Sequence, residues 1–306
     1  MQQSLPIRPI LLLLLCSFLF RCEEPVDLGV VIPEQILLIR SVMVPGELIT
    51  VQVASRSNVI QGITDQPVKH ATVRIFAAGN DSRVDLYFIE GSDGLYRSET
   101  FTPTPGVTYE VWVSADGFTP TIASSFVPPP SELDSVFTKN IERQLTGDRA
   151  TVFFDFGIEF DDPVGVENYY NLRLSQEIRE FVVHPGNDTV FTGSKVVPIE
   201  FPASANHDYK LTRDEGGILF IDNPFENQTI PLKLSVDVTK EKVGVIYAEL
   251  RTVSRDYYLF EESIANGSVG ITGGISTGGS IYSNVDGGGG TVSGYSSNSA
   301  TLSLGN

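Results

Sequence analysis

The chain has 306 residues, with 21 Lys and Arg against 38 Asp and Glu, and a formal net charge of −17 at pH 7. An acidic surface of this kind repels phosphate backbones, which argues against nucleic-acid binding. Hydrophobic residues make up 41% of the chain, including 18 Phe and 11 Tyr, which excludes a disordered chain and supplies enough material for a packed core.

The N-terminus reads as an export signal followed by a lipid anchor. Arg8 precedes an apolar run, ILLLLLCSFLF, which is shorter than the ~20 apolar residues that a membrane helix needs. A short apolar run after a positive charge is typical of a secretory signal peptide. The run leads to Cys22 and then to acidic and turn-prone residues, as in bacterial lipoproteins. We predict a signal at residues 1–21, a tether at residues 22–33, and acyl chains on Cys22 that hold the protein at a membrane.

The leader leaves one alternative open. Lipoprotein signal peptidases prefer a small residue just before the cysteine, and Arg21 occupies that position. An ordinary secretory signal with an incidental cysteine would explain the same pattern. Cys16 and Cys22 are the only cysteines of the chain. Because both belong to the leader region, we expect no disulfide in the mature domains, whose stability then comes from burial.

Residues 34–127 alternate short strand-like runs with turns. The runs Glu34–Val44 and Glu47–Ala54 flank a Pro-Gly turn, and Thr108–Ser114 alternates apolar and polar residues. A period of two indicates strands with one buried face, and short strands joined by turns indicate a β-sandwich. A PV-x-x-A-x-V strand, a D-G-x-Y turn and TYEVWVSADGF also resemble the transthyretin-like, carboxypeptidase-regulatory module. We therefore predict an immunoglobulin- or transthyretin-like sandwich here.

The aromatic residues of this segment allow two interpretations. Tyr96, Tyr109 and Trp112 could form a ligand-binding face on the sandwich. Aromatics of this kind more often fill sandwich cores, so we favour packing for them. Trp112 stays a candidate for stacking on a ligand, together with Tyr169 and Tyr170 further along the chain.

A proline-rich stretch, FVPPPSE, separates this segment from the rest of the chain. Consecutive prolines favour an extended, semi-rigid connector. We predict a linker at residues 128–132 and a larger β-rich domain at residues 133–306. Alternating runs such as Arg149–Phe160 and Asn168–Ser175 recur through that second domain. The predicted fold class is all-β.

One stretch of the second domain changes its period from two to that of a helix. Thr252 or Ser254 can cap the start of this helix, and the Asn-Gly pair at residues 266–267 can end it. We expect the single substantial helix of the mature chain here. The residues spaced as one apolar stripe are Val253, Tyr257, Phe260 and Ile264.

The chain from Gly267 to Asn306 is rich in glycine and serine, a composition typical of a flexible linker. Apolar residues such as Ile281, Val292 and Leu304 nevertheless recur through it. Four adjacent glycines are also typical of close backbone approach between packed strands. We favour an ordered return into the second domain, with an interaction arm as the alternative.

Motifs for catalysis or metal binding are sparse. His70, His184 and His207 are isolated in sequence, without a neighbouring metal ligand. The acidic turns at residues 161–162 and 222–224 could bind calcium, but turns use the same residues for local hydrogen bonds, which we favour. The chain has no G-x-S-x-G elbow and no P-loop, since the GGISTGG stretch lacks a lysine. We predict no enzymatic activity, no metal and no cofactor.

Several stretches together carry a family resemblance. They are C-E-x-x-x-D-L at Cys22–Leu28, PVKHATVRI, YEVWVSADG ahead of FVPPPSELDSV, ENYYNLRL, VSRDYYLF and IYSNVDGGGGTVSGYSS. Together they resemble a family of Bacteroidota outer-membrane lipoproteins defined by domain of unknown function 4249. One departure is the NPF segment, which lies at Asn223–Phe225 instead of just before IYSN.

The resemblance implies an outer-membrane or cell-surface lipoprotein, often encoded beside a TonB-dependent receptor, and transfers no catalytic residues. Glu23 and Glu24 resemble the acidic positions after the lipidated cysteine that direct such lipoproteins to the cell surface. The first functional hypothesis is thus a non-enzymatic accessory that docks on a TonB-dependent receptor or captures nutrient for it. The alternative is a stand-alone surface module that binds glycans or peptides.

Overall fold

The computed structural model describes residues 35–59, 62–79, 83–186, 188–202, 209–212, 217–224, 228–267 and 281–304. Cys22, Glu23 and Glu24, and with them the predicted signal and tether, lie outside the described residues. The GGISTGG stretch and His207 lie outside them too. Across the described ranges, no helix combines the length and the apolar content that a membrane span requires.

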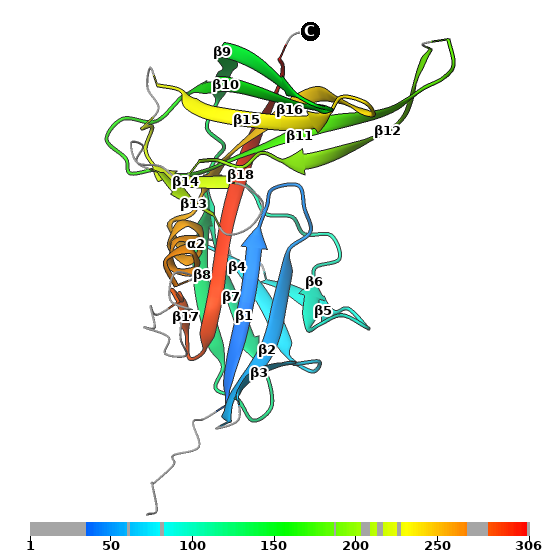
Figure 1. Cartoon of the computed structure of the whole chain (residues 1–306). Helices are drawn as coiled ribbons and strands as arrows, with labels where there is room; N and C mark the ends of the chain where they lie inside the picture. The colour runs from blue at the N-terminus through cyan, green and yellow to red at the C-terminus, as the bar shows by residue number, and fades with distance from the viewer. Residues whose placement is uncertain are drawn as a thin grey trace, which may run out of the picture. The chain divides into compact units, whose positions relative to one another are not determined.

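Strands account for most of the described chain, which confirms the predicted all-β fold class (Figure 1). In chain order the strands up to the proline-rich stretch are β1 (Ile36–Met43), β2 (Thr50–Val59), β3 (Gly62–Pro67), β4 (Thr72–Ala77), β5 (Arg83–Phe88), β6 (Leu95–Arg97), β7 (Val107–Ser114) and β8 (Thr121–Val127). Those that follow it are β9 (Leu133–Thr146), β10 (Arg149–Phe160), β11 (Tyr169–Val183), β12 (Thr189–Pro198), β13 (Tyr209–Leu211), β14 (Gly217–Ile221), β15 (Ile230–Asp237), β16 (Glu241–Val253), β17 (Val285–Asp286) and β18 (Gly289–Ser303).

The strands form a 15-stranded sheet and a 3-stranded sheet. The long sheet runs β13-β14-β11-β16-β18-β1-β2-β6-β5-β4-β7-β8-β17, with β12 beside β11 and β3 beside β2. The short sheet is β15-β10-β9. Successive side chains of a strand point to opposite faces of its sheet, so one face of each sheet can be buried in a hydrophobic core.

The strands β1 to β8 enclose one hydrophobic core. Strand β8 alternates buried and exposed residues along its whole length, as a strand with one buried face should. Tyr96 and Tyr109 lie fully inside this core, which confirms the packing role that we favoured for them. Their hydroxyls are also satisfied there: that of Tyr96 donates to the Val68 carbonyl at 2.9 Å, and that of Tyr109 accepts from the Thr104 amide at 2.8 Å.

The strands β9 to β16 enclose a second core between the short sheet and one face of β11, β16 and β18. Strand β10 supplies five alternating apolar residues, and β15 faces it in register, with Val152 opposite Leu234. The inner residues of β11 and β16 complete the layer, for example Leu172 opposite Leu250. The largest fully buried side chains of this core are Phe154, Phe156, Tyr170 and Phe220.

The single helix of the described residues is α2 (Arg255–Gly267), where the sequence predicts it. Ser254 caps it, because its Oγ accepts the Tyr257 amide at 3.2 Å. The predicted apolar stripe is only partly right. Val253 ends strand β16, and Tyr258, which the stripe omits, is the buried helix residue that packs on Leu219.

Strand β18 belongs to both cores. Its first half, Gly289–Gly294, pairs in parallel with β1, and its second half, from Tyr295, pairs antiparallel with β16. Val292 accordingly packs in the first core and Leu304 in the second. The glycine-rich tail is therefore ordered from residue 281 to 304, as predicted, but the pairing with β1 was not expected.

The glycines around the start of β18 have the role that the sequence indicates. A Cβ on Gly288 would lie 2.5 Å from the Leu37 carbonyl oxygen, and Gly290 has φ +104° with its backbone against Ile39. Only glycine allows both this approach and this conformation. The proline-rich stretch is also held by β18, since Ser296 Oγ donates to the Pro128 carbonyl at 2.6 Å. The domain bounds that we set at this stretch stay a prediction.

Candidate functional site

Two of the sequence motifs meet in one hydrogen-bonded network, here called the Asp256 seam: Ser125, Ser254, Asp256, Tyr282 and Asn284. Asp256 accepts from Ser125 Oγ at 2.7 Å and from Tyr282 Oη at 2.8 Å. Ser254 Oγ accepts the Gly294 amide of β18. Asn284 bonds Val292 twice, donating to its carbonyl at 2.8 Å and accepting its amide at 3.0 Å. The seam thus joins α2, β8 and β18.

The hydrogen bonds of the Asp256 seam have a structural role. Burial and the hydrogen bond to Asp256 raise the pKa of Tyr282 to about 12, so this hydroxyl stays protonated at neutral pH. Each Asp256 oxygen already accepts a protein donor. A site for acid–base catalysis would instead keep a group with a pKa near the working pH within reach of a substrate.

The two acidic turns weighed for calcium also meet. Asp162 Oδ1 accepts from Tyr170 Oη at 2.7 Å, and Asp162 Oδ2 accepts the Asn223 amide at 3.0 Å. Asp222 Oδ1 accepts the Asn168 amide at 2.8 Å. These oxygens accept protein N–H and O–H donors, but the donors lie 8, 61 and 54 positions away in the sequence, so the bonds link separate segments and are not the local turn bonds that we favoured. In the part of the chain that the structure describes, no group of three or more His, Cys, Asp or Glu could hold a metal ion.

The aromatics proposed for ligand stacking do not form one surface. Tyr170 is fully buried between Phe160 and Phe220, at ring-centroid distances of 4.9 and 5.4 Å. Burial also raises the pKa of Tyr170 far above its usual value. Tyr169, the residue before it, points to the opposite face of the sheet, where the centre of its ring lies 5.1 Å from that of Tyr258 on α2.

Trp112 lies apart from these tyrosines, on β7. It is half-buried, and the Arg74 guanidinium sits 5.1 Å from the centre of its ring. This cation–π contact covers a ring that a ligand would otherwise use. The structure therefore places Trp112, Tyr169 and Tyr170 in three different packing environments.

A groove of about 440 Å³ lies between two hairpins at the end of the second core. One hairpin is β9–β10 of the short sheet and the other is β11–β12 of the long sheet, which Figure 1 shows reaching out beyond the neighbouring strands. We call this space the hairpin groove. Its aliphatic lining is Ala150, Val152, Val236, Val238, Val243, Val245 and Leu304.

Three cations line the same groove: Arg143 from β9, Arg179 from β11 and Lys242 from β16. The only acidic lining residue is Glu241, whose carboxylate accepts from Lys195 at 2.8 Å and from the Asp237 amide. The bond from Lys195 lowers the pKa of Glu241, so it stays ionised and paired. In a chain with 38 acids and 21 bases, this local excess of positive charge is a departure from the average.

The β11–β12 hairpin itself exposes apolar side chains. Val182 and Val190 face each other across it and are 48% and 47% exposed. Phe191, at the edge of the groove, is 56% exposed and packs edge-on against Phe181. Strand β12 is bonded only to β11, so among the described residues its other edge has no strand partner.

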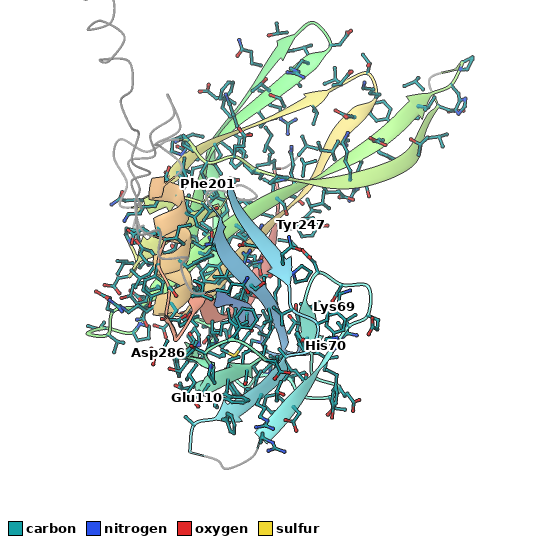
Figure 2. The ribbon with its side chains drawn as sticks, turned by 90° about the horizontal axis from the view of Figure 1, so that it is seen from below. Lys69, His70, Glu110, Phe201, Tyr247 and Asp286 are labelled. Atoms are coloured by element: carbon teal, nitrogen blue, oxygen red, sulfur yellow. The ribbon has the colours of Figure 1, made fainter. Side chains whose placement is uncertain are left out.

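A second hollow, of about 480 Å³, lies at the base of the same hairpin on the outer face of the long sheet. Tyr247, labelled in Figure 2, lines it and is 39% exposed. Polar residues surround the ring: Arg173, Ser175, Glu249 and Ser299. Tyr247 pairs with Ser175, which in turn pairs with Pro198 at the end of β12.

Sequence reasoning missed both hollows. Arg143, Arg179 and Lys242 come from three strands far apart in the sequence, and each is an ordinary polar residue of an alternating strand. Only the pairing of the strands brings them together. One signal was available in the sequence. Basic residues are scarce in this chain, and those close to the ends of predicted strands could have been compared as candidates for a shared site.

The sequence model of one protein family matches residues 23–301, and its description is "Domain of unknown function (DUF4249)". The match spans nearly all of the chain and includes the Asp256 seam and the hairpin groove apart from Ser303 and Leu304. No curated protein matches the chain. The chain belongs to the DUF4249 family.

Proposed function

We propose that this protein is a non-enzymatic lipoprotein of the outer membrane or cell surface, held there by acyl chains on Cys22. It acts as an accessory to a TonB-dependent receptor, by docking on it or by capturing nutrient for it. Membership of the DUF4249 family supports this proposal through the lipoproteins that the sequence motifs resemble. The leader and Glu23 and Glu24 support the location.

The observation that carries the docking role is the β11–β12 hairpin. Its exposed valines, Val182 and Val190, form an apolar surface at the end of the hairpin and belong to neither core. Exposed apolar surface of this kind marks interaction sites in soluble domains. The open edge of β12 adds unpaired backbone groups that a partner strand could use.

The test is co-purification with the TonB-dependent receptor encoded beside the gene, from detergent-solubilised membranes. We expect Val182→Ser with Val190→Ser to abolish co-purification, because the substitutions remove the apolar surface without touching a core. Tyr87→Ser, at a residue of β5 that is 58% exposed, is the matched control and should leave it intact. Equal recovery of the receptor with the wild type and the double variant would reject docking through this hairpin.

The anchor has a separate test. Cys22→Ser should release the protein from membranes or leave the precursor uncut, because the thiol carries the lipid. Membrane fractionation and mass spectrometry of the mature N-terminus measure this. An unacylated N-terminus at another residue would reject the anchor.

The alternative, a stand-alone module that binds glycans, is favoured by one observation. The hollow around Tyr247 combines a half-exposed ring with Arg173, Glu249 and Ser299, which is the mixture of stacking and hydrogen bonding that sugars require. Tyr247→Ala should then abolish binding to immobilised polysaccharide while receptor co-purification is unchanged. Binding of glycans by Tyr247→Ala at wild-type affinity would reject this role.

A further inference from the structure

Strand β12 has a free edge, at which no strand of the described residues pairs. The Ile199 amide donates to the Leu174 carbonyl at 2.9 Å, and the register of β11 with β12 continues from that pair past Ser194 without a shift. Along an antiparallel ladder, residues that exchange hydrogen bonds with the neighbouring strand alternate with residues that do not. The N–H and C=O groups of Ser194 and Val196 therefore point away from β11, toward the free edge.

Two features of β12 limit the length of this free edge. Pro198 has no N–H group, so it cannot donate to a strand added there. A register shift between Glu180 and Phe181 leaves Thr192 as an extra residue of β12, and a bulge of this kind interrupts regular pairing. The regular part of the free edge therefore lies between the bulge and the proline, at residues 193–197.

The lysine of β12 does not block this edge. Proteins often place a lysine on an exposed edge strand, because its charge opposes pairing with another chain. Lys195 is the only charged residue of β12, and it lies opposite Ile178, on the other face of the sheet from Val196. Its Nζ donates to Glu180 at 3.2 Å and to Glu241 at 2.8 Å. The lysine side chain therefore lies over its own sheet and away from the edge.

On the face opposite to that lysine, the side chains beside the edge are apolar. Val196 is 59% exposed, and with Pro198 it lines the hollow that contains Tyr247. Ser175 pairs with both Pro198 and Tyr247, so these residues share one face of the long sheet. A strand added to β12 would place alternate side chains on the same face, beside Val196. An apolar side chain at that position makes the best contact.

The backbone groups decide what kind of partner can cover the edge. A helix or an alkyl chain over Ser194 and Val196 would bury their N–H and C=O groups without hydrogen-bond partners, which is unfavourable. A helix has already bonded its own backbone groups, and an alkyl chain has none. An extended strand, by contrast, supplies both the donors and the acceptors.

A second copy of this chain fits the edge less well than a different strand. The antiparallel register that pairs Ser194 with Val196 of the second copy would place the two Lys195 side chains directly opposite each other. Like charges in that position are destabilising. The extended strand is therefore better supplied by another protein.

We propose that β12 docks by strand addition: an extended segment of the TonB-dependent receptor pairs with residues 193–197 and places an apolar side chain beside Val196. Ser194 and Val196 supply the N–H and C=O groups on the side of this protein. In strand addition the backbone bonds give affinity and the alternate side chains give specificity. This inference rests on the docking role proposed above and deepens it, because it names the bonds by which the hairpin holds its partner.

Proline substitutions test the backbone bonds. Val196→Pro and Ser194→Pro each remove an N–H group that points to the free edge, and they leave the bonds between β12 and β11 in place. Each should lower recovery of the receptor from detergent-solubilised membranes by about tenfold or more. Val196→Thr is the matched control, because it keeps the N–H group and nearly the same side-chain shape, and it should lower recovery less than either proline variant.

Two results of this experiment would overturn the proposal. One is recovery of the receptor with Val196→Pro and Ser194→Pro at the wild-type level. The other is an equal loss for Val196→Pro and Val196→Thr, because docking would then depend on the side chain and not on the backbone.

Amide hydrogen exchange tests the same bonds without a substitution. In the free protein the outward amides of Ser194 and Val196 should exchange faster than those of Lys195 and Val197, which face β11. Binding of the purified receptor should slow exchange at Ser194 and Val196 by about tenfold or more. Unchanged exchange at both amides in the complex would overturn the proposal, whether or not the proline variants fold.

The valine variant of the docking test separates failure of this inference from failure of docking. Loss of the receptor with Val182→Ser and Val190→Ser, but with neither proline variant, would keep the docking role and reject strand addition. Recovery of the receptor with all of these variants would reject docking through the hairpin as well. Analytical ultracentrifugation of the protein alone tests for a second copy at the edge. Self-association that Val196→Pro abolishes would overturn the choice of the receptor as the partner.

Discussion

The Asp256 seam and the hairpin groove differ in how they satisfy their polar and apolar groups. In the seam, Asp256, Ser254 and Asn284 each bond more than one partner, and those partners come from β8, α2, β18 and the segment just before β17. In the groove, aliphatic side chains of both sheets face an open space, and cations line its rim. The hydrogen bonds of the seam hold α2, β8 and β18 together, whereas the groove separates the β9–β10 hairpin from the β11–β12 hairpin.

The difference shows why sequence motifs and binding surfaces need not coincide. Two of the motifs of the chain, VSRDYYLF and IYSNVDGGGG, supply the seam residues Ser254, Asp256, Tyr282 and Asn284 and hold α2 against β18. The residues best placed to meet a ligand lie on β9, β11 and β16, outside those motifs. Substitutions should therefore affect stability at the seam and binding at the groove.

The largest effect should follow from removing residues 281–306. This deletion removes the partner of both β1 and β16 and takes Val292 and Leu304 from the two cores. Burial of one such side chain is worth about 1.5–3 kcal/mol, against a total stability of about 5–15 kcal/mol. We expect a protease-sensitive, aggregating product. A circular-dichroism melt like that of the full chain would show that the seam and β18 do not join the cores.

A single substitution in the seam should have the next largest effect. Asp256→Ala leaves Ser125 and Tyr282 without their acceptor and should cost about 3 kcal/mol of unfolding free energy in urea, since hydrogen bonds to charged groups are worth about 1.5–3 kcal/mol each. Asp134→Ala, at an exposed residue of β9, is the control. Equal midpoints for the two variants would contradict the structural role of the seam.

The sequence predicts the individual strands and the helix on both sides of this contrast, but not all of their residues. Alternation identified β10 and β11, the change of period identified α2, and the four glycines indicated close backbone approach. These signals are local, because a strand or helix shows its period in its own residues. The stripe on α2 was misread at Val253 and Tyr258 because the strand continues to the residue before the cap.

What the sequence did not show depends on pairing between distant strands. The parallel bond of β18 with β1 and the meeting of Asp162 with Asn223 have no local pattern. The same holds for the groove, since Arg143, Arg179 and Lys242 become neighbours only when the hairpins are placed. The ring of Tyr170 illustrates the limit at one residue: alternation gave the strand, but the structure was needed to show which face of it is buried.

The pH dependence of stability should distinguish the seam from the rest of the molecule at alkaline pH. The folded-state pKa of Tyr282 is raised from 10.0 to about 12, so its contribution is complete below pH 10 and is lost as the pH rises toward 12. Tyr282→Phe should reduce stability by about 1 kcal/mol at pH 8, through the lost bond to Asp256. The variant should also lose less stability than the wild type between pH 10 and 12. Parallel pH curves would show that another tyrosine dominates.

A substitution on a hairpin beside the groove should lower the stability of the protein far less than a substitution in the seam. Leu145, on the β9–β10 hairpin, is 67% exposed, and Leu145→Ser should change the unfolding free energy by no more than about 0.5 kcal/mol. Urea denaturation of this variant beside Asp256→Ala measures the contrast directly. A loss above 2 kcal/mol would mean that the hairpins are packed together in solution and the groove is closed.

The smallest effect should be that of chelators. Asp162 and Asp222 accept protein donors, so EDTA should leave the melting temperature unchanged. Differential scanning calorimetry with and without EDTA checks this. A drop of several degrees would identify a cation at the acidic turns.

The pairing of β18 with β1 has a consequence for the order of folding. Ser293 Oγ donates to the carbonyl of Ser41, a residue 252 positions earlier in the chain. Strand β1 therefore lacks one neighbour until the end of the chain has been synthesised, and the contact order of the whole molecule is high. Such topologies fold slowly, and their partly formed sheets expose unpaired edges while they wait. We expect the first core to stay incomplete, and to need protection by a chaperone, until the last strand is available to pair with β1.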